Sequence, residues 1–84
     1  MPHIPLEPLK SSNVSAAGYD PATLTLRVQF DNGRVYDYND VEPVLAGFFF
    51  ASPSHGETLN KRIKPDCPAH ELTDEEMEEY FDFK

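Results

Sequence analysis

The chain has 84 residues, which is enough for one small domain whose single core provides modest stability and excludes an elaborate buried active site. It has 15 acidic residues against 7 Lys and Arg, and the resulting net charge of −8 disfavours binding through a phosphate backbone. Residues 1–64 hold 7 acids and 6 bases, net −1, whereas residues 65–84 hold 8 acids and 1 base, net −7. The acidity therefore belongs to the C-terminal segment.

The remaining composition favours a soluble intracellular protein. Cys67 is the only cysteine, so no intramolecular disulfide can form and a reducing compartment is the simpler assumption. No secretory hydrophobic region is present, and the longest apolar run, residues 44–51, is too short to span a bilayer. We expect no membrane association and no cofactor.

The first element in chain order is an arm, residues 1–10, with Pro at positions 2, 5 and 8. Proline removes backbone donors and favours an extended path, so Ile4, Leu6 and Leu9 are expected along an edge of the domain. A weak first strand over residues 13–19 ends at the turn signal Asp20-Pro21.

The next strand, residues 23–30, alternates strictly. Its apolar positions are Leu24, Leu26, Val28 and Phe30, and its polar positions are Thr23, Thr25, Arg27 and Gln29. Such alternation predicts a strand with one buried and one solvent-exposed face. Asp31-Asn32-Gly33 then closes a hairpin into a third strand, residues 34–39.

Two closures of this hairpin compete, and they place Tyr36 and Tyr38 on opposite faces. A two-residue loop pairs Phe30 with Val35 and sets both tyrosines beside Arg27 and Gln29, as an exposed aromatic platform. A three-residue loop with Gly33 in a bulge pairs Phe30 with Arg34 and sets them beside Val28 and Leu26, on the core side. We favour the second, because the covered face needs apolar area.

Two short helices should follow. Asp40 is the expected cap of the first, which tolerates Pro43 in its first turn and has an inward stripe of Val41, Val44, Leu45, Phe48 and Phe49. Phe50 lies off that stripe and either packs against the C-terminal segment or contacts a partner. Ser54 and Glu57 have capping-box spacing for a second helix through Lys64, with Leu59 and Ile63 inward.

The end of the second helix carries the only basic cluster of the sequence, Lys61, Arg62 and Lys64, beside Asn60. These donors would form either an ordinary solvated helix end or an anion-binding surface.

An acidic amphipathic helix is expected after the breaker segment 65–68. Thr73 and Glu76 have the spacing of a capping box, and Met77, Tyr80 and Phe81 form an apolar stripe. The helix docks on its own domain, serves as a ligand for another protein, or covers the basic cluster as an internal competitor for phosphate. Its candidate partner-binding residues are Asp74, Glu75, Glu78, Glu79 and Asp82.

Signals for catalysis are poor, and we predict no enzyme. His3, His55 and His70 are isolated, and Cys67 with His70 supplies only half of the four ligands that a structural zinc site needs. No glycine-rich loop or nucleotide-binding motif is present.

The region from Ser11 to Lys64 resembles the KTSC domain, a small bacterial and phage domain also found at the C-terminus of some lysyl-tRNA synthetases. The resemblance rests on Gly18-Tyr19-Asp20, the Gly33-x-Val35-Tyr36-x-Tyr38 hairpin, Asp40-Val41 and the Asn60-Lys61-Arg62-Ile63 end. It implies a bacterial cytoplasm, or a host cytoplasm for a phage-encoded protein, and brings no catalytic residues. RNA binding has been suggested for the family, but the acidic segment does not suit it.

Together these observations predict an α+β fold, a three-stranded antiparallel β-meander covered by two short helices, with an arm (1–10), a KTSC-like domain (11–64) and an acidic helical tail (65–84). The favoured function is a non-catalytic binding module for a protein with a basic surface, conceivably a phage-type inhibitor acting through its acidic tail. The alternative is RNA or other single-stranded nucleic acid on the sheet face and the basic cluster. The candidate surface comprises Arg27, Gln29, Tyr36, Tyr38, Phe50, Asn60, Lys61, Arg62 and Lys64. The sequence sets no oligomeric state.

Overall fold

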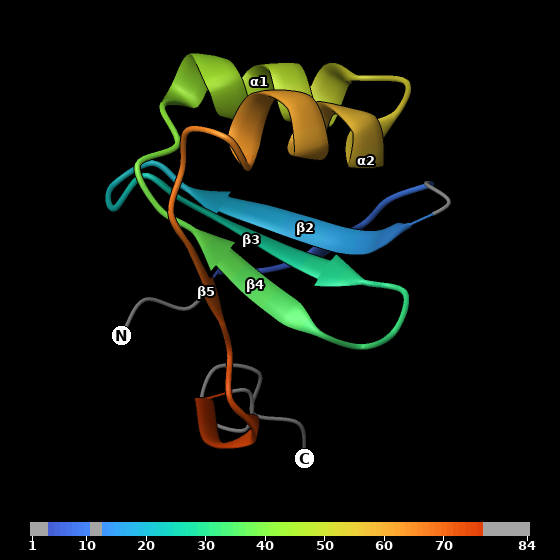
Figure 1. The fold of residues 1–84 in the computed structure, drawn as a ribbon, viewed down its shortest axis with the longest axis vertical. Coiled ribbons are helices and arrows are strands. Elements are labelled where there is room, and N and C mark those ends of the chain that lie inside the picture. The colour runs from blue at the N-terminus through green and yellow to red at the C-terminus, as the bar shows by residue number, and fades with distance from the viewer. Residues whose placement is uncertain (1–3, 11–12, 77–84) are drawn as a thin grey trace.

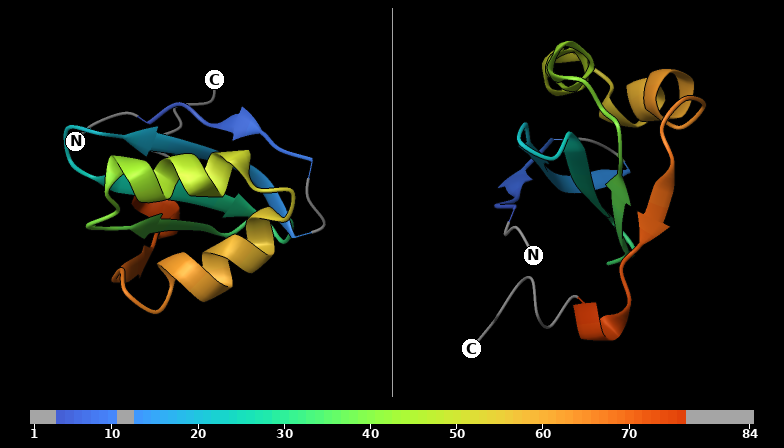
Figure 2. Two further views of the ribbon diagram at one scale, coloured as in Figure 1. Left: turned by 90° about the horizontal axis from the view of Figure 1, so that it is seen from above. Right: turned by 90° about the vertical axis from the view of Figure 1, so that its left-hand side faces the viewer.

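A computed structural model describes residues 4–10 and 13–76 of the chain. They form one antiparallel sheet whose five strands follow chain order, β1-β2-β3-β4-β5, with the helices of residues 43–63 on one side of it (Figures 1 and 2). The elements are β1 (Glu7–Pro8), β2 (Val14–Asp20), β3 (Thr25–Phe30), β4 (Val35–Tyr38), α1 (Pro43–Ala51), α2 (His55–Thr58), the π-helical turn η1 (Leu59–Ile63) and β5 (Ala69–Glu71).

The α+β class is confirmed, but the expected number of three strands is wrong. The N-terminal arm contributes β1, where Glu7 lies opposite Ala17 of β2. The acidic segment contributes β5, where His70 lies opposite Asp37 of β4. Both added strands are two or three residues long and border prolines. Alternation over four to eight residues, the usual signal of a strand, cannot appear in such short segments.

The β3–β4 hairpin closes through the three-residue loop. Gly33 has a φ of 91°, and its N–H donates to the Phe30 carbonyl at 2.9 Å. The Phe30 N–H in turn donates to the Arg34 carbonyl, also at 2.9 Å. Tyr36 lies opposite Val28, and Tyr38 opposite Leu26, so the favoured register is confirmed and both tyrosines share the helix-covered face.

The helices bury one face of the sheet in a single apolar cluster. Leu59 and Ile63 are inward, as predicted, at 1% and 0% exposure. Ser54 is the N-cap of α2, but its side chain makes no capping hydrogen bond. The expected capping box is therefore wrong, because Glu57 pairs instead with Lys61 at 2.8 Å. The cluster contains Val14, Ala17, Leu26, Val28, Tyr38, Val41, Ala46, Phe49, Leu59, Ile63 and Cys67.

The inward face of α1 differs from the predicted stripe. Val44 and Phe48 are 73% and 57% exposed, whereas Ala46 and Phe49 are buried. Every residue of α1 is apolar or glycine, so spacing alone could not select which side of the helix faces the sheet. The expected cap at Asp40 is also wrong, because Glu42 is the N-cap of α1.

Asp40 precedes that cap with a φ of 61° and does not cap α1.

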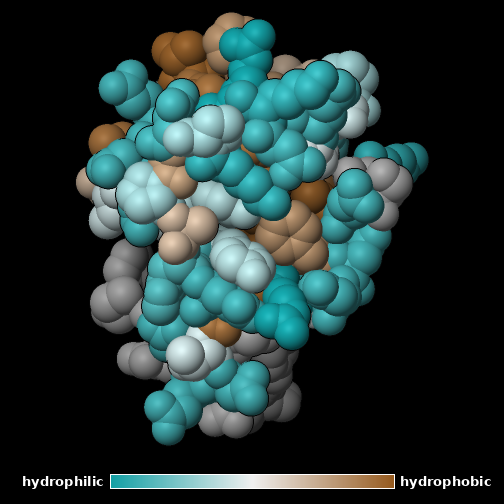
Figure 3. Space-filling view, viewed as in Figure 1, coloured by the Kyte–Doolittle hydropathy of each residue, from teal (hydrophilic) through white to brown (hydrophobic). Residues whose placement is uncertain are grey.

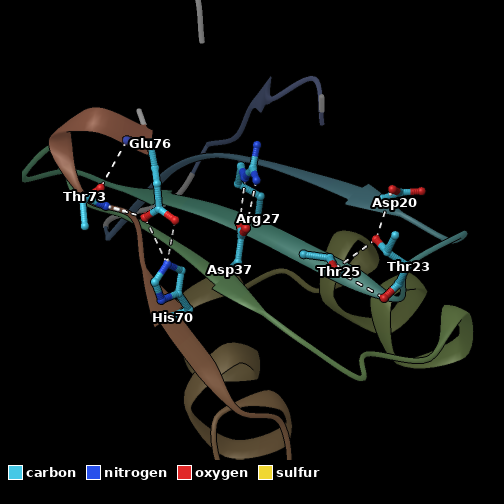
Figure 4. A network of polar contacts seen from close by, with 8 residues as sticks. All are labelled: Asp20, Thr23, Thr25, Arg27, Asp37, His70, Thr73 and Glu76. Carbon is cyan, nitrogen blue, oxygen red and sulfur yellow. Dashed lines mark hydrogen bonds and ion pairs between the residues drawn. The ribbon is translucent and has the colours of Figure 1, made fainter. Parts of the chain in front are cut away.

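The second face of the sheet is covered as well, so the expected solvent-exposed polar face is wrong. Arg27 is only 2% exposed and donates through Nε and Nη2 to the two carboxylate oxygens of Asp37, at 2.7 and 2.8 Å (Figure 4). The N-terminal arm reaches this region at Gly18, where a Cβ atom would lie 2.0 Å from the Pro5 carbonyl oxygen. Glycine is required there because the arm crosses so closely.

The Thr73–Glu76 capping box is confirmed. The Thr73 N–H donates to Glu76 Oε1 at 2.8 Å, and the Glu76 N–H donates to Thr73 Oγ1 at 3.2 Å (Figure 4). Residues 74–76 are helical, and the helix expected beyond them, including Glu78, Glu79 and Asp82, lies outside the described residues. Within residues 4–10 and 13–76, no helix has the length and apolarity needed to cross a bilayer.

Candidate functional site

A groove of about 790 Å³ opens on the helix-covered side of the sheet, and we call it the hairpin groove. Its volume falls within the range of about 300–1,000 Å³ that is common for ligand sites. One wall is the β3–β4 hairpin, and the other is the segment that links η1 to β5. The lining residues are Asn13, Phe30, Asp31, Asn32, Arg34, Tyr36, Tyr38, Lys64, Cys67, Pro68 and Ala69.

Three aromatic rings form a continuous apolar floor in the groove. Tyr36 and Tyr38 stack with their centroids 6.3 Å apart and an interplanar angle of 25°. Phe30 meets Tyr36 edge-on, with centroids 5.6 Å apart. Tyr38 is 1% exposed, whereas Phe30 and Tyr36 are half-buried. The buried Tyr38 ring therefore supports the floor from below, and the Phe30 and Tyr36 rings are accessible to a ligand.

Two cations border this aromatic floor. The Lys64 Nζ lies over the Phe30 ring, 5.8 Å from its centroid. The Arg34 Nη1 pairs with Glu71 Oε2 at 2.7 Å, and the Tyr36 hydroxyl donates to Glu71 Oε1 at 3.3 Å. The Glu71 carboxylate of β5 thus occupies both the Arg34 guanidinium and the Tyr36 hydroxyl at one end of the groove.

The rim at the hairpin turn is held by local hydrogen bonds. The Ser15 hydroxyl donates to Asp31 Oδ1 at 2.7 Å, and the Asp31 N–H donates to the Asn13 carbonyl at 3.0 Å. The Asn32 side-chain oxygen accepts from the Arg34 N–H at 3.0 Å. These contacts fix the turn, so the groove is formed before any ligand arrives.

Two groups that line the groove, the Tyr38 hydroxyl and the Cys67 thiol, are harder to deprotonate than usual. Burial, and then the neighbouring Tyr36, raise the pKa of Tyr38 to about 12. Burial, followed by the charges of Asp66 and Asp40, raises the pKa of Cys67, whose thiol contacts the Asp40 carbonyl at 3.7 Å. His70 instead pairs with Glu76 at 3.0 Å. In the described part of the chain, no three His, Cys, Asp or Glu side chains gather in a way that could hold a metal ion.

The observed hairpin register separates four candidate binding residues onto the two faces of the sheet. Tyr36 and Tyr38 line the groove, but Arg27 and Gln29 belong to the opposite face, where Arg27 is buried against Asp37. The alternative two-residue closure, which would have placed all four residues on one exposed face, is therefore excluded.

The basic cluster is also divided. Lys64 enters the groove, Lys61 pairs with Glu57 at 2.8 Å, and the Arg62 guanidinium lies 5.8 Å from the Phe48 ring centroid. Asn60 is exposed outside the groove. Phe50 is half-buried and contacts Phe49, with ring centroids 5.2 Å apart, so it packs into the domain core.

Several residues that line the groove were not predicted as site residues from the sequence. Phe30, Asn13 and Asn32 gave no signal of their own, although the three-residue closure already implies that Phe30 lies near Tyr36. Pro68 and Ala69 belong to a breaker segment and a three-residue strand, and nothing in their local sequence predicts that they wall a groove.

Comparisons with known proteins assign the chain to a family. The KTSC domain model matches residues 10–66, and the chain belongs to this family of small α+β domains. A KTSC domain protein of Yersinia pestis has a similar solved structure, with a TM-score of 0.77 and 27% identity over 83% of this chain and 99% of that one.

Relatives include both a small protein and part of a large enzyme. A protein of Tsukamurella paurometabola is 38% identical over 60 residues, which is 71% of this chain and 90% of the relative. A lysine–tRNA ligase of Nostoc punctiforme is 37% identical over 60 residues, but these make up only 11% of the ligase. The resemblance to the family expected from the hairpin motifs is therefore confirmed.

Proposed function

We propose that the protein is a non-catalytic binding module whose hairpin groove takes an unpaired nucleotide of RNA. The observation that carries this proposal is the joint presence of open rings at Phe30 and Tyr36 and of Lys64 beside them in one preformed groove. Proteins bind unpaired bases by stacking them on aromatic side chains and holding phosphates on cations.

The chemistry of the groove rim supports the same ligand class. The Asn32 side-chain oxygen accepts from the Arg34 N–H, and its amide nitrogen is a donor of the kind that pairs with an acceptor on the edge of a base. The lysine–tRNA ligase relative, which carries a similar segment, is named for an enzyme that acts on an RNA. The net charge of −8 opposes tight binding to a polyanion, so we expect a contact confined to one or two nucleotides.

Titration with a fluorescein-labelled single-stranded RNA of mixed sequence at low salt tests the proposal. Tyr36→Leu removes the stacking ring and keeps apolar volume. The free energy of binding should therefore weaken by about 1–3 kcal/mol, the usual contribution of one stacked base. Tyr36→Phe keeps the ring and loses the hydroxyl, and it should bind like the wild type. Equal binding by Tyr36→Leu and the wild type would exclude the groove.

The basic cluster provides a matched control for charge. Lys64→Gln removes a cation that lines the groove, whereas Lys61→Gln removes one that pairs with Glu57 outside it. Both variants lose one positive charge, so a difference between them reports position and not net charge. We expect only Lys64→Gln to weaken RNA binding.

A protein with a basic surface is the second candidate partner. Residues 65–84 carry 8 acids and 1 base, and Asp74 and Glu75 are exposed in the helical turn between Thr73 and Glu76. Association through such a segment should weaken steeply between about 50 and 200 mM salt, because exposed charges are screened. A pull-down from bacterial lysate, repeated with Asp74→Asn and Glu75→Gln, tests it, and a partner retained equally by both forms would contradict this role.

A further inference from the structure

The outer side of α1 presents an uncharged stripe. Its exposed residues follow helical spacing, i, i+3, i+4 and i+7, and they are Val44, Gly47, Phe48 and Ala51. Val44 is 73% and Phe48 57% exposed, the two large hydrophobic side chains of the described residues with such exposure. In Figure 3, hydrophobic residues gather at the top of the molecule, over α1, against a mostly hydrophilic surface. We call these four residues the α1 stripe.

A helix that is apolar all round normally has both sides buried. The inner side of α1 is buried through Ala46 and Phe49, but the stripe on its outer side faces solvent. Exposed apolar side chains that are contiguous on one element mark interaction sites more often than isolated ones do. The stripe therefore fits a binding surface that is distinct from the hairpin groove, whose lining includes no residue of α1.

We propose that the occupant of the α1 stripe is a second copy of this chain. The stripe alternates two large side chains, Val44 and Phe48, with two small residues, Gly47 and Ala51. In a two-fold pair, the same patch serves both copies, so the surface must be complementary to itself. An antiparallel pair of α1 helices meets this requirement, because the large side chains of one copy lie over the small residues of the other.

The space above Gly47 is open within the monomer. Apart from the adjacent residues and the backbone of α1 itself, a Cβ atom built there would meet no heavy atom of the described residues within 4 Å. None of them therefore fills this notch between Val44 and Phe48. Glycine lowers helix stability, and its position in an exposed helix interior is not explained by crowding inside the monomer. Close approach of a second helix gives it a reason.

Charge at the ends of the stripe favours the same partner. Glu42 lies just before the first turn, and Arg62 lies over Phe48, near the last turn. In an antiparallel pair, Glu42 of one copy approaches the end of the other copy that carries Arg62, and the contact occurs twice by symmetry. The chain has a net charge of −8, so two copies approach best through an uncharged surface that offers this pairing.

The size of the surface sets the expected strength. Nine residues of helix are about 14 Å long at 1.5 Å per residue. A stable interface buries about 800 Å² on each partner, which one short helix does not supply by itself. The proposed pair is consequently weak and forms at high protein concentration.

Sedimentation equilibrium of the full chain over a hundredfold range of concentration tests for the pair. Gly47→Gln fills the notch with a side chain that the monomer accommodates, so it should reduce the association constant at least tenfold while thermal unfolding is unchanged or occurs at higher temperature. Gly47→Ala keeps a small residue and should still associate. Association that persists equally in Gly47→Gln would place the contact elsewhere, and a wild-type chain that stays monomeric throughout would overturn the proposal.

A charge exchange tests the antiparallel arrangement. Glu42→Arg leaves only arginine at both ends of the stripe, and Arg62→Glu leaves only glutamate, so each variant alone should associate at least tenfold more weakly than the wild type. Mixing the two variants restores both Glu–Arg contacts, and the mixture should associate more strongly than either variant alone. A mixture no stronger than its components would refute the pairing of Glu42 with Arg62.

Discussion

At the scale of single residues, the buried ion pair of Arg27 and Asp37 is the polar contact on which folding should depend most. Its side chains are 2% and 13% exposed, and the carboxylate accepts two hydrogen bonds from the guanidinium. Removal of one partner from a buried pair leaves a charge in a medium that solvates it poorly. Removing one partner should therefore cost more folding free energy than the intact pair itself contributes.

Asp37→Asn should lower the free energy of unfolding by about 3–5 kcal/mol, measured by urea denaturation. Glu71→Gln is the comparison, because it breaks the Arg34–Glu71 pair at the same N–O distance, 2.7 Å, but with side chains 60% and 40% exposed. Solvent screens that pair, so the loss should stay below about 1 kcal/mol. Similar losses in the two variants would show that burial does not govern this pair.

Cys67 gives a second prediction at this scale. The side chain is 6% exposed, and burial raises the pKa of its thiol. Because the thiolate is the reactive form, alkylation by a small maleimide at pH 7 should be at least tenfold slower in the native protein than after unfolding in urea. Equal rates in the two states would mean that the core around Cys67 opens readily.

Sequence reasoning worked where a residue signal was specific and failed where partners come from distant segments. Alternation predicted β3 and the placement of Val28 and Leu26, and the need for apolar area selected the correct hairpin register. The same alternation wrongly predicted that Arg27 is exposed to solvent. Nothing in the sequence of that strand indicates that the N-terminal arm crosses Gly18. Half of the groove likewise depends on where residues 64–69 return to the sheet.

At the scale of elements, local capping signals and apolar spacing each gave a mixture of right and wrong predictions. The Thr73–Glu76 box formed as predicted, but Asp40 does not cap α1 and the Ser54 side chain does not cap α2. The inward positions predicted for α1 are right at Phe49 and wrong at Val44 and Phe48. A capping box depends on hydrogen bonds between residues three apart, but a neighbouring charge such as Lys61 can pair with the acidic member instead. The direction in which a uniformly apolar helix faces depends on the surface beneath it.

The capping box gives a pH-dependent prediction. The backbone hydrogen bond from Thr73, followed by the contact with His70, lowers the pKa of Glu76 below its ordinary value of 4.5. A carboxylate with a lowered pKa stabilises the folded state above its unfolded pKa, and this contribution is lost as the pH falls through the folded pKa. The turn should therefore loosen only in acid, below pH 4.5.

Nuclear magnetic resonance measures this effect directly at the Thr73 amide, whose N–H donates to Glu76 Oε1. Its chemical shift should titrate with a midpoint below 4.5 in the wild type and show no such transition in Glu76→Gln. A midpoint at or above 4.5 would mean that the hydrogen bond to the carboxylate does not persist in solution.

The helix α1 gives a stability prediction that does not depend on dimer formation. Gly47 lies in the interior of an exposed helix face, and an added methyl group meets no atom within 4 Å. Alanine is a better helix former, so Gly47→Ala should raise the free energy of unfolding by about 0.5–1 kcal/mol in urea denaturation at low protein concentration. A loss of stability would mean that α1 needs the freedom of glycine at this position.

At the scale of the whole molecule, the acidic segment places one of its carboxylates, that of Glu71, beside a cation that lines the groove. Glu71 belongs to β5 and pairs with Arg34 at 2.7 Å, so a carboxylate of the acidic segment already occupies this cation. The sequence predicted an internal competitor for phosphate, but on Lys61, Arg62 and Lys64. Lys61 is instead neutralised by Glu57, which lies outside the groove.

If the groove binds RNA as proposed, Glu71→Gln should bind it more tightly at low salt, because Arg34 becomes available to phosphate. The salt dependence gives the sharper test, since affinity for single strands falls with a log–log slope of about 0.7 for each phosphate neutralised. With Lys64 alone the slope should be about 0.7, and with Arg34 added it should approach about 1.4. Glu57→Gln removes an equal charge from a pair outside the groove and should leave the slope unchanged. A slope that rises equally in both variants would show that RNA responds to net charge and not to the release of Arg34, while the effect of Tyr36→Leu would still report separately whether the groove is the site.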